Sequence, residues 1–212
     1  IGGSTSWANV RGLLAANIPG IEIVEQNRLK APVVDVWGVS DKNLLLESND
    51  WFAAQRQPFF AVIQTSGNHR PYTIPDEDKP AFNPAIPSPK LLEQNGFISG
   101  EEYRAFAYLD WCIGEFMQRA RRQPYFANTI FAFIGDHGIS GVTGPHFAPA
   151  WRELAITQGH TPLLIYAPGR DMYGAMKIGA WSFREGKFIS DYDAHIATKL
   201  AYVMAGGNLS KP

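Results

Sequence analysis

Continuous apolar runs alternate with amphipathic stretches along this chain, and that alternation predicts both strands and helices. The strands are predicted at 31–37, 58–65, 129–134 and 162–167, which are short, mostly apolar runs that contain β-branched and aromatic residues. The helices are predicted over about 41–52, 99–121 and 193–204. Strands that alternate with helices favour an α/β fold with a largely parallel sheet flanked by helices.

Local signals mark the beginnings of two of these helices. Asp41 is predicted as the N-cap of the first. Ser99, followed three residues later by Glu102, forms a capping-box signature for the second. Cys112 lies among apolar residues at helical spacing in the second helix, so we expect it in the core.

Composition narrows the class of protein. A chain of 212 residues with 45% hydrophobic content is long enough for one α/β domain with a substantial core. The net charge of −1 and the lack of a basic stripe give no support to a nucleic-acid partner. The lone Cys112 excludes an intramolecular disulfide and a cysteine-rich zinc site. Because the chain begins with Ile1, we expect it to be part of a longer protein.

Two polar groups of residues directly follow predicted strands. His69 and Arg70 lie in the proline-rich loop after 58–65, and Asp136 with His137 follows 129–134. Ligands of open α/β sheets bind beyond the carboxyl ends of the strands, so these positions are candidates for a site. Long loops in compact domains are also commonly functional.

Asp136 and His137 are candidate metal ligands. A carboxylate and an imidazole both bind divalent metals, and Gly135 and Gly138 permit a sharp turn beneath them. Two ligands are too few for a complete site. The competing interpretation is a loop aspartate that caps the next helix beside a solvent-exposed histidine.

The other candidates have a structural alternative beside the functional one. His69 can contact a phosphate or sulfate oxygen or act as an acid or base, and Arg70 can pair with an anion; the alternative is an ordered loop packed on Tyr72. His146 is another loop imidazole, and such residues are commonly found at the surface. Trp7 and Arg11, with Asn9 between them, suit a phosphate-bearing head group, or else mark a helix start with Trp7 in the core.

Four segments, taken in order, resemble one known family. The run from Asn128 to Gly138, NTIFAFIGDHG, is similar to a strand-and-metal motif written NTIFVxxxDHG. The runs 58–72, 160–169 and 2–12 are similar to the segments PFF…SNHxPY, PLLIYAPG and YGG…W/F-x-N-M-x-G. Up to about Gly169 the chain therefore resembles the lipoteichoic acid synthase-like branch of the alkaline phosphatase/sulfatase superfamily. The resemblance implies an alkaline phosphatase-like fold, with residues 1–212 as the C-terminal part of a single catalytic domain that is incomplete at its N-terminus.

The resemblance also implies a chemistry. Such enzymes cleave a phosphoester, commonly phosphoglycerol or phosphoethanolamine on a lipid, through a covalent intermediate on a threonine bound to Mn²⁺, Mg²⁺ or Zn²⁺. By resemblance Asp136 and His137 are metal ligands, with Mn²⁺ the first expectation, and His69 contacts the substrate phosphate. His146 corresponds to a second phosphate-side histidine. The residues expected near the head-group pocket are Trp7, Asn9 and Arg11.

One departure from the family limits what this chain can do alone. The family's threonine nucleophile and an acidic metal ligand lie upstream of the segment that 2–12 resembles, and no threonine here has the expected strand-to-helix context. We therefore expect this chain by itself to be inactive. The Cys-x-Pro-x-Arg motif of true sulfatases is absent as well.

The leading hypothesis is a phosphotransferase that acts on a phospholipid or glycolipid substrate. Its N-terminal part would anchor it in the bacterial inner membrane, with this domain extracytoplasmic, in the periplasm or cell envelope. The alternatives are a sulfuric- or phosphoric-ester hydrolase of the same superfamily and, from another class, a non-catalytic binding module that keeps the fold.

Overall fold

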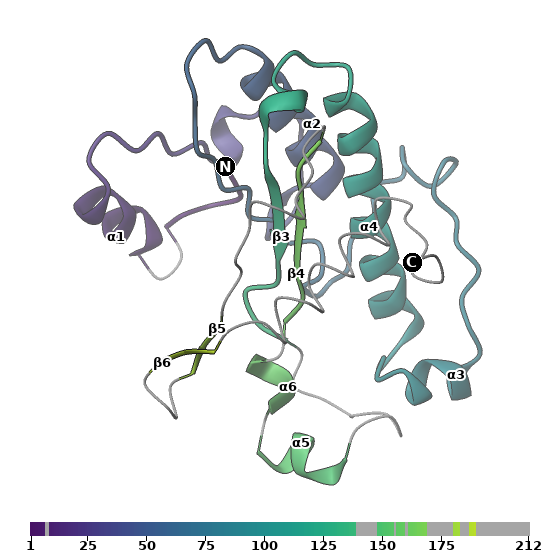
Figure 1. Cartoon of the computed structure of the whole chain (residues 1–212). Helices are drawn as coiled ribbons and strands as arrows, with labels where there is room; N and C mark the ends of the chain where they lie inside the picture. The colour runs from purple at the N-terminus through teal and green to yellow at the C-terminus, as the bar shows by residue number, and fades with distance from the viewer. Residues whose placement is uncertain are drawn as a thin grey trace, which may run out of the picture. The chain divides into compact units, whose positions relative to one another are not determined.

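The computed structural model describes residues 1–6, 9–138, 148–154, 156–159 and 161–168, and the strands at 180–182 and 187–189 (Figure 1). The chain divides into two compact units, Ile1–Tyr125 with Gly141–Leu154 and Phe126–Ser140 with Ala155–Pro212. The helix predicted over 193–204 lies outside the described residues, and within them no helix is long and apolar enough to cross a membrane.

The first unit is mainly helical. Its helices are α1 (Val10–Asn17), α2 (Asp41–Ala53), α3 (Pro89–Gln94), α4 (Gly100–Ala120) and α5 (Pro149–Glu153). A short 3-10 helix is found at Gln26–Arg28, and the strands β1 (Val33–Asp35) and β2 (Gly38–Val39) pair antiparallel. The strand predicted at 31–37 is thus present but shorter.

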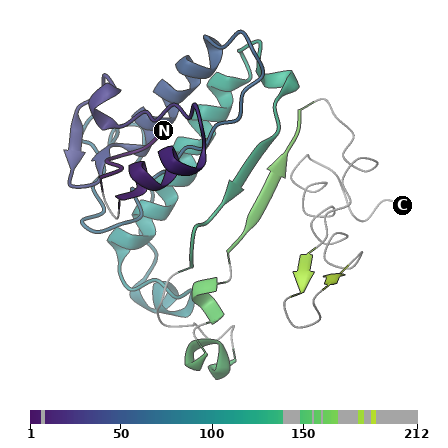
Figure 2. The same ribbon diagram turned by 90° about the vertical axis from the view of Figure 1, so that its left-hand side faces the viewer.

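Packing of α2 against α4 forms the centre of this unit, and the two helices lie side by side in both views (Figures 1 and 2). Small side chains with no exposed surface are found on both helices, Ser48 and Asn49 on α2 and Cys112 and Ala120 on α4. Small residues let helix backbones approach closely, because ridges of one helix then fit the grooves of the other. The prediction that Cys112 is a core residue is confirmed.

The start of α2 differs from the sequence prediction. The N-cap is Ser40, whose hydroxyl accepts a hydrogen bond from the Asn43 amide at 3.2 Å. Asp41, predicted as the cap, is the first helical residue, and its side chain is 2% exposed. At the start of α4 the prediction is confirmed, since the Ser99 hydroxyl accepts from the Glu102 amide at 3.2 Å.

The segment 58–65 does not form the predicted strand. It is extended, and its only backbone partner among the described residues is Ile1, which donates to the Val62 carbonyl at 2.8 Å and accepts from the Gln64 amide at 2.9 Å. Sequence pattern alone cannot supply a ladder partner, and a strand needs one along its length. Phe60 is consequently 93% exposed.

The second unit contains the antiparallel pair β3 (Phe131–Ile134) and β4 (Leu163–Tyr166), drawn as adjacent arrows in Figure 2. Its other elements are a 3-10 helix at Phe126–Asn128, α6 (Ile156–Gly159), and the antiparallel pair β5 (Ala180–Ser182) and β6 (Lys187–Ile189). The strands predicted at 129–134 and 162–167 are confirmed. Every strand pair within the described parts is antiparallel, however, whereas the sequence predicts a largely parallel sheet; the segment 58–65, predicted as one of its strands, forms no ladder.

A buried polar cluster fastens the long loop 66–88 to α2 and α4. Asp78 has no exposed surface, accepts a hydrogen bond from the Tyr108 hydroxyl at 2.6 Å and pairs with the Lys42 ammonium. The Lys42 ammonium also lies 5.4 Å from the centre of the Trp111 ring. Burial, followed by the bond to Asp78, raises the pKa of Tyr108 far above its ordinary value, so the phenol remains a donor.

Replacing Tyr108 with phenylalanine should therefore destabilise the protein. The buried Asp78 carboxylate would lose one of its donors, which typically costs about 1–3 kcal/mol. Urea unfolding should show this loss for Tyr108→Phe. The matched control Tyr103→Phe, a half-buried tyrosine on the same helix, should change the unfolding free energy by less than about 0.5 kcal/mol; equal losses for the two variants would contradict the role of Asp78.

Candidate functional site

The loop that carries His69 is held by hydrogen bonds at its beginning. The Ser66 amide donates to Asp41 Oδ1 at 3.0 Å, and the Gly67 amide reaches both carboxylate oxygens, at 3.2 and 3.1 Å. The amide of His69 donates to the Ser66 carbonyl at 3.2 Å, and its ring Nδ1 lies 3.2 Å from the same oxygen. If Nδ1 carries the proton toward that carbonyl, Nε2 is left for a ligand. The His69 side chain is exposed.

Trp37 supports the same loop from the β1–β2 side. Its ring centre lies 4.2 Å from that of His69, and its indole nitrogen donates to the Arg70 carbonyl at 2.7 Å. The Arg70 guanidinium is 6.0 Å from the centre of the Tyr72 ring. Tyr72 adopts a positive φ of 63° and its hydroxyl donates to Glu102 at 3.4 Å, so the loop also reaches the start of α4. Arg70 is exposed and remains available to an anion.

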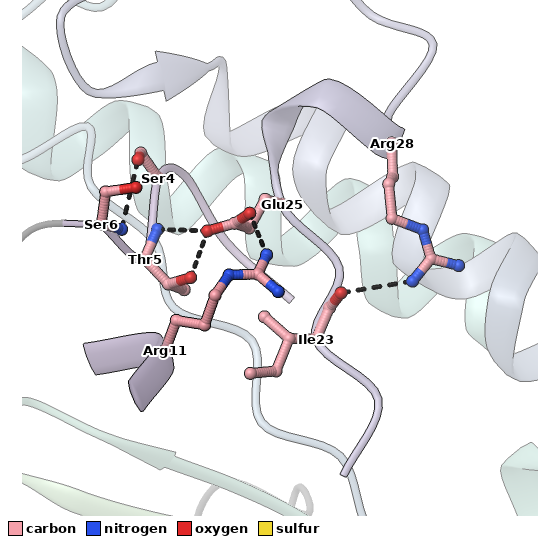
Figure 3. A network of polar contacts seen from close by, with 7 residues as sticks. All are labelled: Ser4, Thr5, Ser6, Arg11, Ile23, Glu25 and Arg28. Carbon is pink, nitrogen blue, oxygen red and sulfur yellow. Dashed lines mark hydrogen bonds and ion pairs between the residues drawn. The ribbon is translucent and has the colours of Figure 1, made fainter. Parts of the chain in front are cut away.

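The N-terminal segment is fastened by Glu25, as Figure 3 shows. The buried Glu25 carboxylate accepts from the Thr5 amide at 2.7 Å and from the Thr5 hydroxyl, and it pairs with the Arg11 guanidinium. Arg11 therefore approaches Glu25 while its side chain remains 53% exposed. Hydrogen bonds from Thr5, then from Arg11, lower the pKa of Glu25 to about 2.

Asn9 lies directly before α1 and adopts a left-handed backbone conformation, with φ of 56°. Its side chain packs over Gly12, where an added Cβ would come within 2.6 Å of Asn9 Oδ1. The helix begins at Val10, and Asn9 is its N-cap without a side-chain hydrogen bond. Trp7, like His146, lies outside the described residues.

In the second unit, Asp136 and His137 follow β3 directly. Both are exposed, Asp136 by 74% and His137 by 64% of the side chain, and Asp136 Oδ2 lies 3.9 Å from His137 Nε2. The His137 Nδ1 lies 2.9 Å from the Gly138 carbonyl. A carbonyl oxygen only accepts, so in the neutral tautomer that donates from Nδ1 the Nε2 atom would be available to a metal. The Gly138 amide donates to the Gln158 carbonyl at 2.7 Å, which ties this turn to α6.

This pair fits a divalent metal in the chemistry of its donors. Imidazole and carboxylate ligands lie about 2.0–2.2 Å from zinc, so two ligands of one tetrahedral ion are about 3.4 Å apart, close to the observed separation. The described part of the chain contains no group of three or more histidine, cysteine, aspartate or glutamate residues placed to hold a metal. Asp136 and His137 are therefore at most a candidate pair of ligands, and a complete metal site would require others.

Three residues that organise these segments were not predicted from the sequence. Trp37 was assigned only to a strand, Asp41 only to a helix cap, and Glu25 to no role. The signal for Asp41 was its position beside Ser40, since two adjacent cap-forming residues leave one side chain available for another partner. Nothing local marks Glu25 as the partner of Arg11, because an irregular segment separates them.

The Glu25 contacts should make stability depend on pH in a defined range. The ordinary pKa of 4.5 falls to about 2 in the folded chain, so ionised Glu25 stabilises the fold above pH 4.5, and this contribution is lost as the pH falls toward 2. At pH 7, Glu25→Gln should lower the unfolding free energy by about 1–3 kcal/mol. In urea unfolding, its difference from wild type should shrink between pH 4.5 and 2.

The matched control is Glu22→Gln, which removes an exposed glutamate paired with Arg28. An exposed ion pair contributes little, so this variant should differ from wild type by less than about 1 kcal/mol at any pH. A deficit of Glu25→Gln that stayed constant from pH 7 to pH 2 would rule out the ionised contact.

Comparison with known proteins places these features in a family. Residues 5–172 match the family model described as Sulfatase. The chain is 30% identical over 104 residues to a lipoteichoic acid synthase of Staphylococcus saprophyticus, covering 49% of this chain and 15% of that protein. It is 28% identical over 127 residues to an N-acetylgalactosamine-6-O-sulfatase of Bacteroides thetaiotaomicron, covering 59% and 20%. The chain thus spans a fifth or less of the length of these relatives.

Solved structures support the same assignment. A protein in the alkaline phosphatase superfamily from Vibrio parahaemolyticus superposes with a TM-score of 0.59 and 26% identity, over 84% of this chain and 40% of that one. The lipoteichoic acid synthase LtaP from Listeria monocytogenes superposes with a TM-score of 0.62 and 18% identity, over 81% and 43%. These likenesses confirm the alkaline phosphatase-like α/β fold class. Because the family model spans most of its residues, the chain belongs to the sulfatase family, an enzyme family of the alkaline phosphatase superfamily.

Proposed function

We propose that the protein containing this chain is a metal-dependent phosphoester transferase that acts on lipid or cell-envelope substrates of the phosphoglycerol or phosphoethanolamine type. The observation that carries the proposal is the Asp136–His137 pair after β3, in which a carboxylate oxygen and the imidazole Nε2 lie 3.9 Å apart. The similarity to lipoteichoic acid synthases supports the choice of a phosphoester.

In this proposal Asp136 and His137 hold a divalent metal, Mn²⁺ first and Mg²⁺ or Zn²⁺ as alternatives. Such an ion, when bound, stabilises negative charge on the oxygens of the nucleophile and the phosphoryl group. With Nδ1 donating to the Gly138 carbonyl, His137 would present Nε2 to the ion. The threonine nucleophile and the remaining ligands would come from a part of the protein outside this chain, so the chain alone would be inactive.

His69 would contact the phosphate of the substrate. Its Nδ1 faces the Ser66 carbonyl, which leaves Nε2 on the exposed side of the ring to bind a phosphoryl oxygen or to transfer a proton. Arg70, on the same loop, would pair with a second anionic oxygen. His69 and Arg70 lie in the same unit of the chain.

The head group would be recognised by the N-terminal segment. Arg11 keeps about half of its side chain exposed while Glu25 fixes one of its nitrogens, a state suited to a second, anionic partner. Asn9 lies two residues before Arg11, as the N-cap of α1. Trp7 and His146 complete the proposed set of substrate contacts.

We also propose the substrate class, the partners and the location of the protein. We propose a phospholipid or glycolipid as the substrate, no nucleic-acid partner, and a parent protein anchored in the bacterial inner membrane with this domain extracytoplasmic. Proximity to the bilayer would give the site access to lipid head groups, whose phosphates match the cationic and imidazole groups described above.

Metal binding by Asp136 gives a direct test. Isothermal titration of Mn²⁺ into the complete protein should show a well-defined site, and Asp136→Ala should weaken it by about 100-fold or more, because even residues that only orient ligands change metal affinity by about 10–100-fold. The control is Asp110→Ala, which removes an exposed aspartate from α4. Unchanged affinity in Asp136→Ala would refute the metal assignment.

A sulfate-ester hydrolase is the second candidate, because one relative is named as an N-acetylgalactosamine-6-O-sulfatase. The Cys-x-Pro-x-Arg motif of true sulfatases supplies their nucleophile, and for either candidate the nucleophile would lie outside this chain, so substrate preference must separate the two. We expect the complete protein to cleave p-nitrophenyl-labelled phosphodiesters faster than p-nitrophenyl sulfate. Faster cleavage of the sulfate would favour the hydrolase, and cleavage of neither would favour a binding module.

A further inference from the structure

Asp41 is placed unusually for the first residue of a helix. An aspartate there is commonly exposed, where it faces the helix dipole and the free amides of the first turn. In α2 it is Ser40 that caps the free amides of the first turn, because its hydroxyl accepts a hydrogen bond from the Asn43 amide. The Asp41 side chain instead turns inward, is 2% exposed, and directs both carboxylate oxygens at another part of the chain.

That other part is the beginning of the loop that carries His69. Two consecutive amides, those of Ser66 and Gly67, donate to the Asp41 carboxylate over 3.0–3.2 Å. The carbonyl of Ser66 is in turn the acceptor nearest His69, 3.2 Å from both its amide nitrogen and its Nδ1. A single peptide segment therefore connects the buried carboxylate on one side with the imidazole on the other.

The fit between the carboxylate and the loop is close. A Cβ added to Gly67 would lie 2.4 Å from Asp41 Oδ2, so any larger residue there would force the two apart. On the other side of the loop, the Ser66 hydroxyl donates to the Trp37 carbonyl at 3.4 Å, and the Trp37 ring lies against His69. The His69 loop is thus fixed between α2 and the β1–β2 hairpin.

The loop contacts also compensate for burying a charge. Burial raises the pKa of Asp41, and the Ser66 and Gly67 amides oppose that rise by stabilising the ionised form. The other titratable groups facing the carboxylate are Asp35 and His69, and Cys112 from α4. Burying a carboxylate costs free energy unless it is hydrogen-bonded, and here both backbone donors belong to one loop.

We propose that Asp41 is a positioning residue that sets the place of the His69 imidazole by anchoring the Ser66–Gly67 amides. The proposal rests on the proposed function, in which His69 contacts the substrate phosphate. Asp41 itself, being buried, would touch neither substrate nor metal. Its removal should therefore lower the rate of the chemical step and leave the affinity for the rest of the substrate nearly unchanged.

The first measurement concerns the loop alone and needs no activity. Amide hydrogen exchange of Ser66 and Gly67, followed by NMR, should accelerate at least tenfold in Asp41→Asn. The control is Asp50→Asn, an exposed aspartate on the same helix paired with Arg119, which should leave both amides unchanged. Unchanged exchange in Asp41→Asn would overturn the proposal at its structural step.

The second measurement uses the complete protein and a p-nitrophenyl phosphodiester. Asp41→Asn should lower kcat at least tenfold with KM within twofold of wild type. In the His69→Ala background the same substitution should lower kcat less than twofold, because Asp41 acts through His69. Equal losses in both backgrounds would show a general effect on the fold and would overturn the proposal.

A second variant guards against misfolding of Asp41→Asn. Gly67→Ala leaves the carboxylate intact but forces the loop away from it, so it should reproduce the loss of kcat. Full activity in Gly67→Ala would also overturn the proposal. Failure of the proposed function is separately visible: His69→Ala would then retain wild-type kcat, while the exchange of Ser66 and Gly67 would still respond to Asp41→Asn.

Discussion

The contact between α2 and α4 is the constraint on which the first unit depends. Side chains as small as Ser48 and Cys112 are fully buried there, so the two backbones lie close and leave little freedom to shift. Residues at the start of α2 are consequently held in fixed positions, and they are the ones that reach the irregular parts of the chain. The loops are thus held in place by a helix pair that itself contains none of the proposed catalytic groups.

Acidic side chains hold the irregular segments of the first unit in place. Irregular segments lack the ladders that satisfy backbone amides in helices and sheets, and each buried amide requires an acceptor. Acidic side chains supply it repeatedly: Glu25 for Thr5, Asp41 for Ser66 and Gly67, Glu47 for Lys30 and Ala31, and Glu102 for Ile98. Ionised acceptors form stronger hydrogen bonds than neutral ones, so a few of them replace many weaker contacts.

The sequence predicted those elements whose determinants are local. The strands near 129–134 and 162–167 follow from their apolar runs, and the start of α4 follows from Ser99. The choice between Ser40 and Asp41 as the cap of α2 could not be predicted, because both residues cap helices well and the decision comes from amides 25 residues away. For the same reason the strand predicted at 58–65 was wrong, since extended backbone becomes a strand only through its neighbours.

The sequence likewise predicted only some features of the candidate site. Proximity to strand ends identified His69, Asp136 and His137 as residues of interest, and sequence patterns assigned them to a family. Neither source predicted the contact between His137 Nδ1 and the Gly138 carbonyl, because that contact depends on the local turn. Nor did either predict that Arg11 would be shared with Glu25, which depends on the path of the irregular segment between them.

The extended segment 58–65 has a further consequence for handling the protein. Its backbone presents amides and carbonyls without a ladder among the described residues, beside the almost fully exposed ring of Phe60. An open, apolar strand edge is a template on which another chain can add in register. We therefore expect concentrated samples of this chain to self-associate through this segment, and a charged residue in place of Phe60 to oppose it.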